Sequence, residues 1–100
     1  MDQAKIENNI GILYLQTGQL EGAEAIFRHA LTQTLPKNQH GKIRASITHN
    51  LGEACLAQNR LFEAGLFVQQ AIVLWERLGD PIEVMNSIGV QGGILRRQGH

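Results

Sequence analysis

Side chains that could support acid–base, nucleophilic or metal chemistry are few and scattered along the chain. Four histidines and one cysteine are present: His29, His40, His49, His100 and Cys55. None is spaced with a carboxylate or thiol in the way a zinc site requires. Cys55 falls on an apolar helical stripe, which predicts a buried thiol and not a nucleophile. The sequence therefore predicts no catalytic residue, no metal site and no cofactor, and indicates that the protein is not an enzyme.

Amides and cations offer binding chemistry instead. Asn9 and Asn50 occupy matching places in two similar segments of the chain. A side-chain amide has two donors and an acceptor that suit the backbone of an extended peptide. The alternative is that both amides bond to a neighbouring helix and fix its packing. Arg96 and Arg97 form a small basic patch, which suits either a helix C-terminus or the binding of an acidic peptide tail.

These residues belong to a grid of apolar and small residues that appears twice in the chain. The first copy holds Ile10, Gly11, Tyr14, Gly18, Leu20, Ala23, Phe27 and Ala30, and the second Leu51, Gly52, Cys55, Asn59, Leu61, Ala64, Val68 and Ala71. Gly18 and Asn59 are residue types that accept the left-handed conformation closing a helix. A further step of nearly the same length reaches Gly92 and Gly99. Counting from Gly89 is the other possible register for this third unit.

Each copy reads as two helices with apolar residues at helical spacing. The first unit has predicted helices from near Ile6 to before Gly18 and from Leu20 to near Leu35-Pro36. The second has helices from near Ile43 to near Cys55 and from Leu61 to Leu78. A fifth helix runs from Pro81 to near Gln98. Pro81 after Gly79-Asp80 suits a first helical turn. A glycine inside a helix costs about 1 kcal/mol relative to alanine. Gly11 and Gly52 are therefore predicted to let helices pack closely, facing Ala23 and Ala64.

This grid resembles the tetratricopeptide repeat, whose pattern has a glycine and an aromatic on the first helix and alanine, aromatic and alanine on the second. The packing residues on which the resemblance rests are Gly11, Tyr14, Gly18, Ala23, Phe27, Ala30, Gly52, Ala64, Ala71 and Gly92. It implies an all-α, right-handed solenoid of antiparallel helix pairs. We expect one domain over 1–100, with repeats at about 1–40 and 41–80 and a half repeat at 81–100. The period is longer than the family's usual one and is similar to the long repeats of bacterial transcriptional regulators, signalling ATPases and kinesin light chains.

In such a stack the first helix of each unit lines the concave side. The expected exposed positions are Lys5, Asn9, Ile12 and Gln16, then Ser46, Asn50, Glu53 and Ala57, then Asn86, Val90, Gly93 and Arg97. The predicted contacts with a partner are Lys5, Asn9, Ile12, Gln16, His49, Asn50, Glu53 and Arg97. The resemblance implies that this face holds a protein or peptide segment.

Composition limits the other functions. Nine basic and nine acidic residues cancel, so no overall field attracts nucleic acid or an anionic membrane. No apolar run approaches the ~20 residues of a membrane span, and the first residues are not typical of a signal peptide. With a single cysteine, a cytoplasmic protein is expected.

The fifth predicted helix leaves an apolar face without a partner helix. Its residues are Ile82, Met85, Ile88, Ile94 and Leu95. Either the array continues in a longer chain, or a second copy covers this face and makes a homodimer through residues 81–100. The leading prediction is a protein-binding scaffold within a larger bacterial regulatory or signalling protein, and the alternative is a self-assembly module.

Overall fold

The computed structural model describes residues 2–34 and 41–99, and this part of the chain consists of five α-helices without a strand. They are α1 (Gln3–Gln16), α2 (Leu20–Thr32), α3 (Gly41–Ala57), α4 (Leu61–Leu78) and α5 (Pro81–Arg97). The five predicted helices are therefore confirmed. Helix α2 ends at Thr32, and the predicted stop at Leu35-Pro36 lies outside the described residues, as does most of the connector that follows it.

Left-handed residues close the first helix of each unit. Gly18 has φ 80° and Asn59 has φ 59°, which confirms the prediction made from their residue types, because both tolerate this conformation better than other residues. Gly99 has φ 84° and occupies the matching place after α5. The turn after α5 therefore falls where the register through Gly92 puts it.

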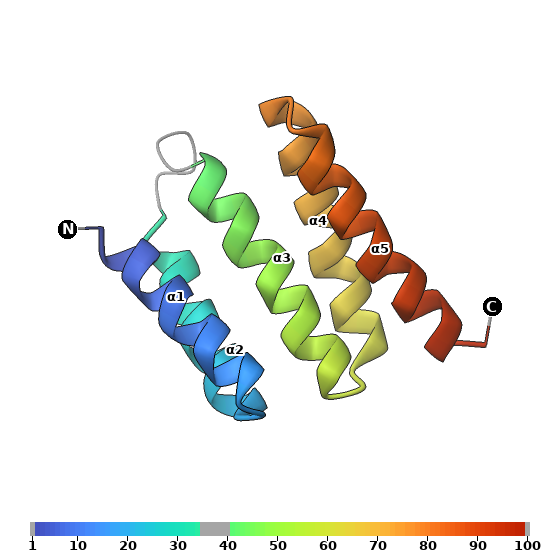
Figure 1. The fold of residues 1–100 in the computed structure, drawn as a ribbon, viewed down its shortest axis with the longest axis horizontal. Helices are drawn as coiled ribbons and strands as arrows, with labels where there is room; N and C mark the ends of the chain where they lie inside the picture. Colours follow the sequence, from blue (N-terminus) through green and yellow to red (C-terminus); the bar gives the residue numbers. More distant parts are fainter. Residues whose placement is uncertain (1, 35–40, 100) are drawn as a thin grey trace.

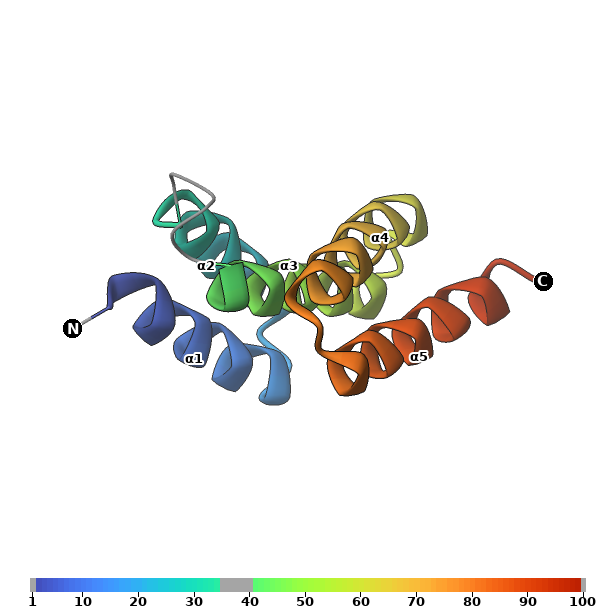
Figure 2. The ribbon, with the colours of Figure 1, turned by 90° about the horizontal axis from the view of Figure 1, so that it is seen from above.

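The helices alternate between two layers. Figure 1 shows α1, α3 and α5 side by side, with α2 and α4 behind them. Seen from above in Figure 2, α1 and α5 lie at the two ends of an arch and α3 is recessed between them. The surface formed by α1, α3 and α5 is therefore concave, and we call it the concave face.

Two of the three apolar clusters join successive helix pairs of the arch. One joins the first helix pair to α3 through Phe27, Ala30, Ile47 and Leu51, all 0% exposed, with Tyr14 half-buried beside them. The other joins α3, α4 and α5 through Cys55, Val68, Ile72 and Ile94. Burial of a large apolar side chain contributes about 1.5–3 kcal/mol, so these clusters fix the positions of the helices that form the concave face.

Both interior glycines lie against a large side chain of the next helix. A Cβ atom at Gly11 would stand 2.4 Å from Phe27 Cε1, and one at Gly52 would stand 2.5 Å from Val68 Cγ2. The three atoms nearest to this position all belong to the Phe27 ring, so Gly11 makes room for an aromatic side chain. At Gly52 the alanine does take part, because the Ala64 carbonyl oxygen would lie 3.5 Å away.

One prediction about α5 is wrong. The sequence pattern places Ile94 on the bare face, yet it is 3% exposed and packs in the second cluster against α3 and α4. Its neighbour Leu95 is 45% exposed. Successive residues of a helix point about 100° apart, so one can be buried against α4 while the next faces outward.

Candidate functional site

A hollow of about 300 Å³ opens on the concave face, where the C-terminal ends of three helices come together. Its lining residues come from all repeat units: Leu15, Leu20, Glu53, Leu56, Ala57, Val90 and Arg97. The floor is mainly apolar, with one carboxylate and one guanidinium among the lining groups. A concave site with an apolar lining and few polar groups is the usual form of a binding pocket, and this one has the size of a single large side chain or a few smaller ones.

The two charged lining residues are those predicted from the sequence, Glu53 and Arg97. The Glu53 side chain is 40% exposed, and Arg97 Nη1 donates to the Leu56 carbonyl oxygen at 2.6 Å. Leu56 is in the last turn of α3, where carbonyl groups have no partner within the helix. The Leu56 carbonyl oxygen also accepts from the Asn59 backbone N–H at 2.9 Å, so Arg97 adds a second hydrogen bond at the end of α3.

His49 links α3 to α5. Its Nδ1 lies 2.8 Å from Ser87 Oγ, and its Nε2 lies 3.1 Å from Glu53 Oε1. A serine, a histidine and a carboxylate in contact are also the parts of a nucleophilic triad. Ser87, however, is 0% exposed, so its hydroxyl reaches no substrate in this structure. His49 therefore orients Glu53 at the hollow, and its contact with Ser87 holds α5 against α3.

A second polar link joins α1 to α3. Asn50 Nδ2 donates to Asn8 Oδ1 at 2.9 Å, and Asn8 Nδ2 donates to Ser46 Oγ at 3.3 Å. Asn50 is only 9% exposed, whereas Asn9 is exposed to solvent. The prediction that Asn9 and Asn50 lie side by side in an open groove is therefore wrong. For Asn50 the alternative holds, in which the amide bonds to a neighbouring helix and fixes its packing.

These links contain residues that the sequence analysis missed, although a signal for them exists. Each link contains one bonded pair 38 residues apart, Asn8 with Ser46 in the first and His49 with Ser87 in the second. Asn8 and His49 occupy matching places in successive repeat units, and so do Ser46 and Ser87. Polar residues that recur at the repeat period were thus available as an indication of contacts between successive first helices.

The remaining predicted contact residues lie on α1 away from the hollow. Lys5, Asn9 and Gln16 are exposed, and Ile12 is half-buried against the first cluster. The structure therefore brings Glu53, His49 and Arg97 to one place, whereas the predicted contact residues of α1 do not line the hollow.

A charged cluster behind the concave face fastens the turn between α3 and α4 to α2. The Glu24 carboxylate accepts hydrogen bonds from Arg60 Nη2 at 2.6 Å, from Arg28 Nε at 2.8 Å and from Gln58 Nε2 at 2.9 Å. Arg28 also lies over the Phe67 ring, 5.4 Å from its centroid, a favourable cation–π distance.

Ligand atoms of Glu24, Cys55 and Glu63 lie within 4.8 Å of one another, as a metal site would require. The Arg60 guanidinium stands among them, with Nη2 at 3.5 Å from Cys55 Sγ and 3.2 Å from Glu63 Oε2. Arg60 supplies the positive charge at this place, because it pairs with Glu24 at 2.6 Å and with Glu63 at 3.2 Å. We therefore assign this cluster to ion pairing.

The ion pairs also determine the ionisation of Glu24. The hydrogen bond from Arg60, with further ones from Gln58 and Arg28, lowers the pKa of Glu24 to about 2. On α1, hydrogen bonds from Gln3 and His29 lower the pKa of the buried Glu7 carboxylate. Both groups thus remain charged over the whole physiological range.

A stack of antiparallel helix pairs with a hollow on one concave face defines a helical-repeat protein. Residues 8–32, which cover most of α1 and all of α2, match the tetratricopeptide repeat family model. This segment is therefore similar to a tetratricopeptide repeat, and the match is consistent with the long form of the repeat. Neither a curated protein nor a solved structure shows significant similarity to the chain. Within the described ranges, each helix is too short or too polar to cross a membrane.

Proposed function

We propose that the concave face binds an extended or helical segment of another protein, with an apolar side chain of that segment in the hollow. Tetratricopeptide repeats generally mediate interactions between proteins. The observation that carries the proposal is the apolar hollow between α1, α3 and α5, with Glu53 and Arg97 at its edge. We further propose a cytoplasmic scaffold role within a larger bacterial regulatory or signalling protein.

The lining chemistry suggests what the segment offers. Leu15, Leu56 and Val90 would bury an aliphatic or aromatic side chain, which contributes about 1.5–3 kcal/mol. Glu53 accepts and Arg97 donates hydrogen bonds, so a peptide backbone crossing the hollow finds one partner of each kind. The exposed Lys5, Asn9 and Gln16 on α1 extend the same surface for the adjoining residues of the segment.

The test uses a displayed library of random peptides selected against the folded chain. The variant Ala57→Trp fills the hollow, because Ala57 is an exposed residue of its lining. Ala25→Trp is the matched control, since Ala25 is an exposed residue on α2 and does not line the hollow. We expect selected peptides to bind Ala57→Trp at least tenfold more weakly than wild type and to bind Ala25→Trp as wild type. Equal binding to all three proteins would exclude the hollow as the site.

A second candidate function, self-assembly through residues 81–100, is supported by the apolar residues that α5 exposes. Ile82 is 74% exposed, Met85 67%, Leu95 45% and Ile88 44%. A contiguous apolar surface of this kind commonly marks an interaction site. Sedimentation equilibrium over a wide concentration range tests this function: association supports it, and a monomer at every concentration excludes it.

A further inference from the structure

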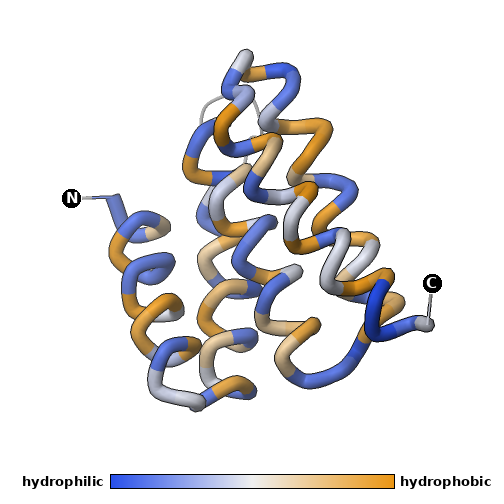
Figure 3. Tube along the Cα trace, turned by 45° about the vertical axis from the view of Figure 1, so that its right-hand side comes forward, coloured by the Kyte–Doolittle hydropathy of each residue, from blue (hydrophilic) through white to orange (hydrophobic). Residues whose placement is uncertain are grey.

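Apolar residues and glycines of α5 that are exposed or half-buried form one stripe. Ile82, Met85, Ile88, Gly89, Gly92 and Leu95 recur at helical spacing along one face of the helix, and we call them the outer stripe. The buried residues Ser87 and Ile94 face the other way, toward α3 and α4. In Figure 3, where α5 comes forward, hydrophobic residues recur along this helix and give way to hydrophilic ones near the C-terminus.

The outer stripe has two open positions. A Cβ atom at Gly89 would meet nothing within 4 Å, and one at Gly92 would meet only Arg96 Nη1, at 3.5 Å. At the corresponding position of the second unit, a Cβ atom on Gly52 would stand 2.5 Å from Val68. Helices pack by inserting large side chains of one between those of the other, so Gly89 and Gly92 leave room for large side chains from a second helix.

We propose that a second copy of this chain covers the outer stripe, with the two α5 helices antiparallel about a two-fold axis that passes between Ile88 and Gly89. This inference rests on the second proposed function and specifies its geometry. In this register Met85 faces the partner's Gly92, Ile88 faces the partner's Gly89, and Ile82 faces the partner's Leu95. Each open position receives a large side chain, as Gly11 receives Phe27 within the chain.

Charge favours the same orientation. The N-terminal end of α5 carries Asp80 and Glu83, and the C-terminal end carries Arg96 and Arg97. Antiparallel pairing brings the acidic end of one copy to the basic end of the other, whereas parallel pairing would bring like charges together. Opposite charges set the orientation of paired helices in the same way in coiled coils.

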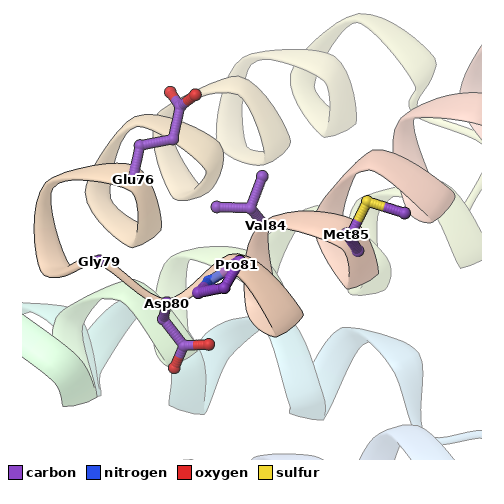
Figure 4. Close-up of a pocket in the computed structure, with 6 residues that line it drawn as sticks. All are labelled: Glu76, Gly79, Asp80, Pro81, Val84 and Met85. Atoms are coloured by element: carbon purple, nitrogen blue, oxygen red, sulfur yellow. The ribbon is translucent and has the colours of Figure 1, made fainter.

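A hollow of about 380 Å³ lies where the partner's α5 would end. It is lined by Glu76, Gly79, Asp80, Pro81, Val84 and Met85. Figure 4 shows Val84 and Pro81 between the carboxylates of Glu76 and Asp80. In the proposed pair the partner's Leu95 packs against Ile82 beside this hollow, and the partner's Arg96 reaches the acidic groups. One two-fold axis thus satisfies both size and charge, which is the requirement for an isologous contact.

Disulfide crosslinking tests the register, because two cysteines bridge only when their Cα atoms are about 4.4–6.8 Å apart. Ile88→Cys lies beside the axis, and we expect most of this variant to form a covalent dimer on oxidation. Ile82→Cys alone and Leu95→Cys alone should stay uncrosslinked, whereas an equal mixture of the two should form a heterodimer. The wild-type chain is the control for Cys55, which is buried.

The outcomes separate the register from self-assembly. A dimer in which Ile82→Cys crosslinks with itself would overturn the antiparallel register and leave self-assembly standing. A wild-type monomer at every concentration would overturn both the register and self-assembly. Leu95→Glu should weaken dimerisation at least tenfold, whereas the control Leu66→Glu, at a residue of α4 that is 51% exposed, should not. Dimerisation of Leu95→Glu as tight as that of wild type would also overturn the proposal.

Discussion

The helix pair α3 and α4 and the single helix α5 present the same kind of surface in two different situations. Gly52 on α3 is filled by Val68 of α4, whereas Gly92, its counterpart in the next unit, has no side chain of another helix against it. A glycine inside a helix lowers stability, and only the first of these two positions compensates through packing. The comparison shows that the first helix of a unit has the same glycine-containing packing surface whether or not another helix packs on it.

The largest effect should come from emptying an occupied position. Phe27→Ala removes the ring that lies against Gly11, and we expect it to lower the free energy of unfolding by about 3–5 kcal/mol. Phe62→Ala is the matched control, because Phe62 is 76% exposed, and it should change stability by less than about 0.5 kcal/mol. Urea unfolding followed by circular dichroism measures both. Similar losses in the two variants would show that the contact of Phe27 with Gly11 adds no stability beyond that of an exposed aromatic residue.

A smaller effect concerns the ion pairs that join α2 to the turn between α3 and α4. The pKa of Glu24 is about 2 in the folded chain against 4.5 for the free group, so its ion pairs stabilise the fold fully above pH 4.5. This contribution is lost as the pH falls from 4.5 towards 2. We expect the ion pairs of Glu24 to contribute about 2 kcal/mol to the free energy of unfolding, a value reduced because the arginines are partly exposed.

The variant Glu24→Gln isolates this contribution. Its stability deficit relative to wild type should be largest near neutral pH and should shrink as the pH approaches 2, as measured by urea unfolding at a series of pH values. A deficit that does not change with pH would show that the carboxylate acts through packing and not through its charge.

The smallest effects come from adding one methyl group at each of the two glycines. Gly52→Ala places a Cβ atom against Val68, and overpacking of about 1–3 kcal/mol should outweigh the gain in helix propensity of about 1 kcal/mol. Gly92→Ala meets only the flexible end of Arg96 and should stabilise the dilute chain by up to about 1 kcal/mol. Opposite signs in thermal unfolding support the comparison, and equal signs contradict it.

Much of the fold could be predicted from the sequence because the same pattern of apolar and small residues occurs in two repeat units. Apolar spacing located all five helices, and Gly18 and Asn59 located the turns that end α1 and α3. These features depend on local preferences of residues, which one sequence reveals. The recurrence of the grid also established that Gly11 and Gly52 occupy equivalent places.

The candidate site was less predictable, because it depends on how each helix is rotated against its neighbours. The sequence pattern puts Asn50 and Glu53 on one exposed face, yet Asn50 is buried against Asn8 while Glu53 lines the hollow. The same reasoning leaves Ile94 outside, where the structure buries it. A helical wheel shows which residues share a face, but a rotation of a few tens of degrees decides which of two adjacent residues at the edge of that face is covered.

The polar links between α1 and α3 and between α3 and α5 also affect how the array can deform. Apolar contacts tolerate small sliding movements, whereas the bonds of Asn50 to Asn8 and of His49 to Ser87 require a fixed distance and direction. Flattening or tightening the arch would stretch these bonds before it opened the apolar clusters. The bending stiffness of the concave face is therefore concentrated in a few side chains, and a ligand that needs a different curvature loses affinity by the free energy of breaking them.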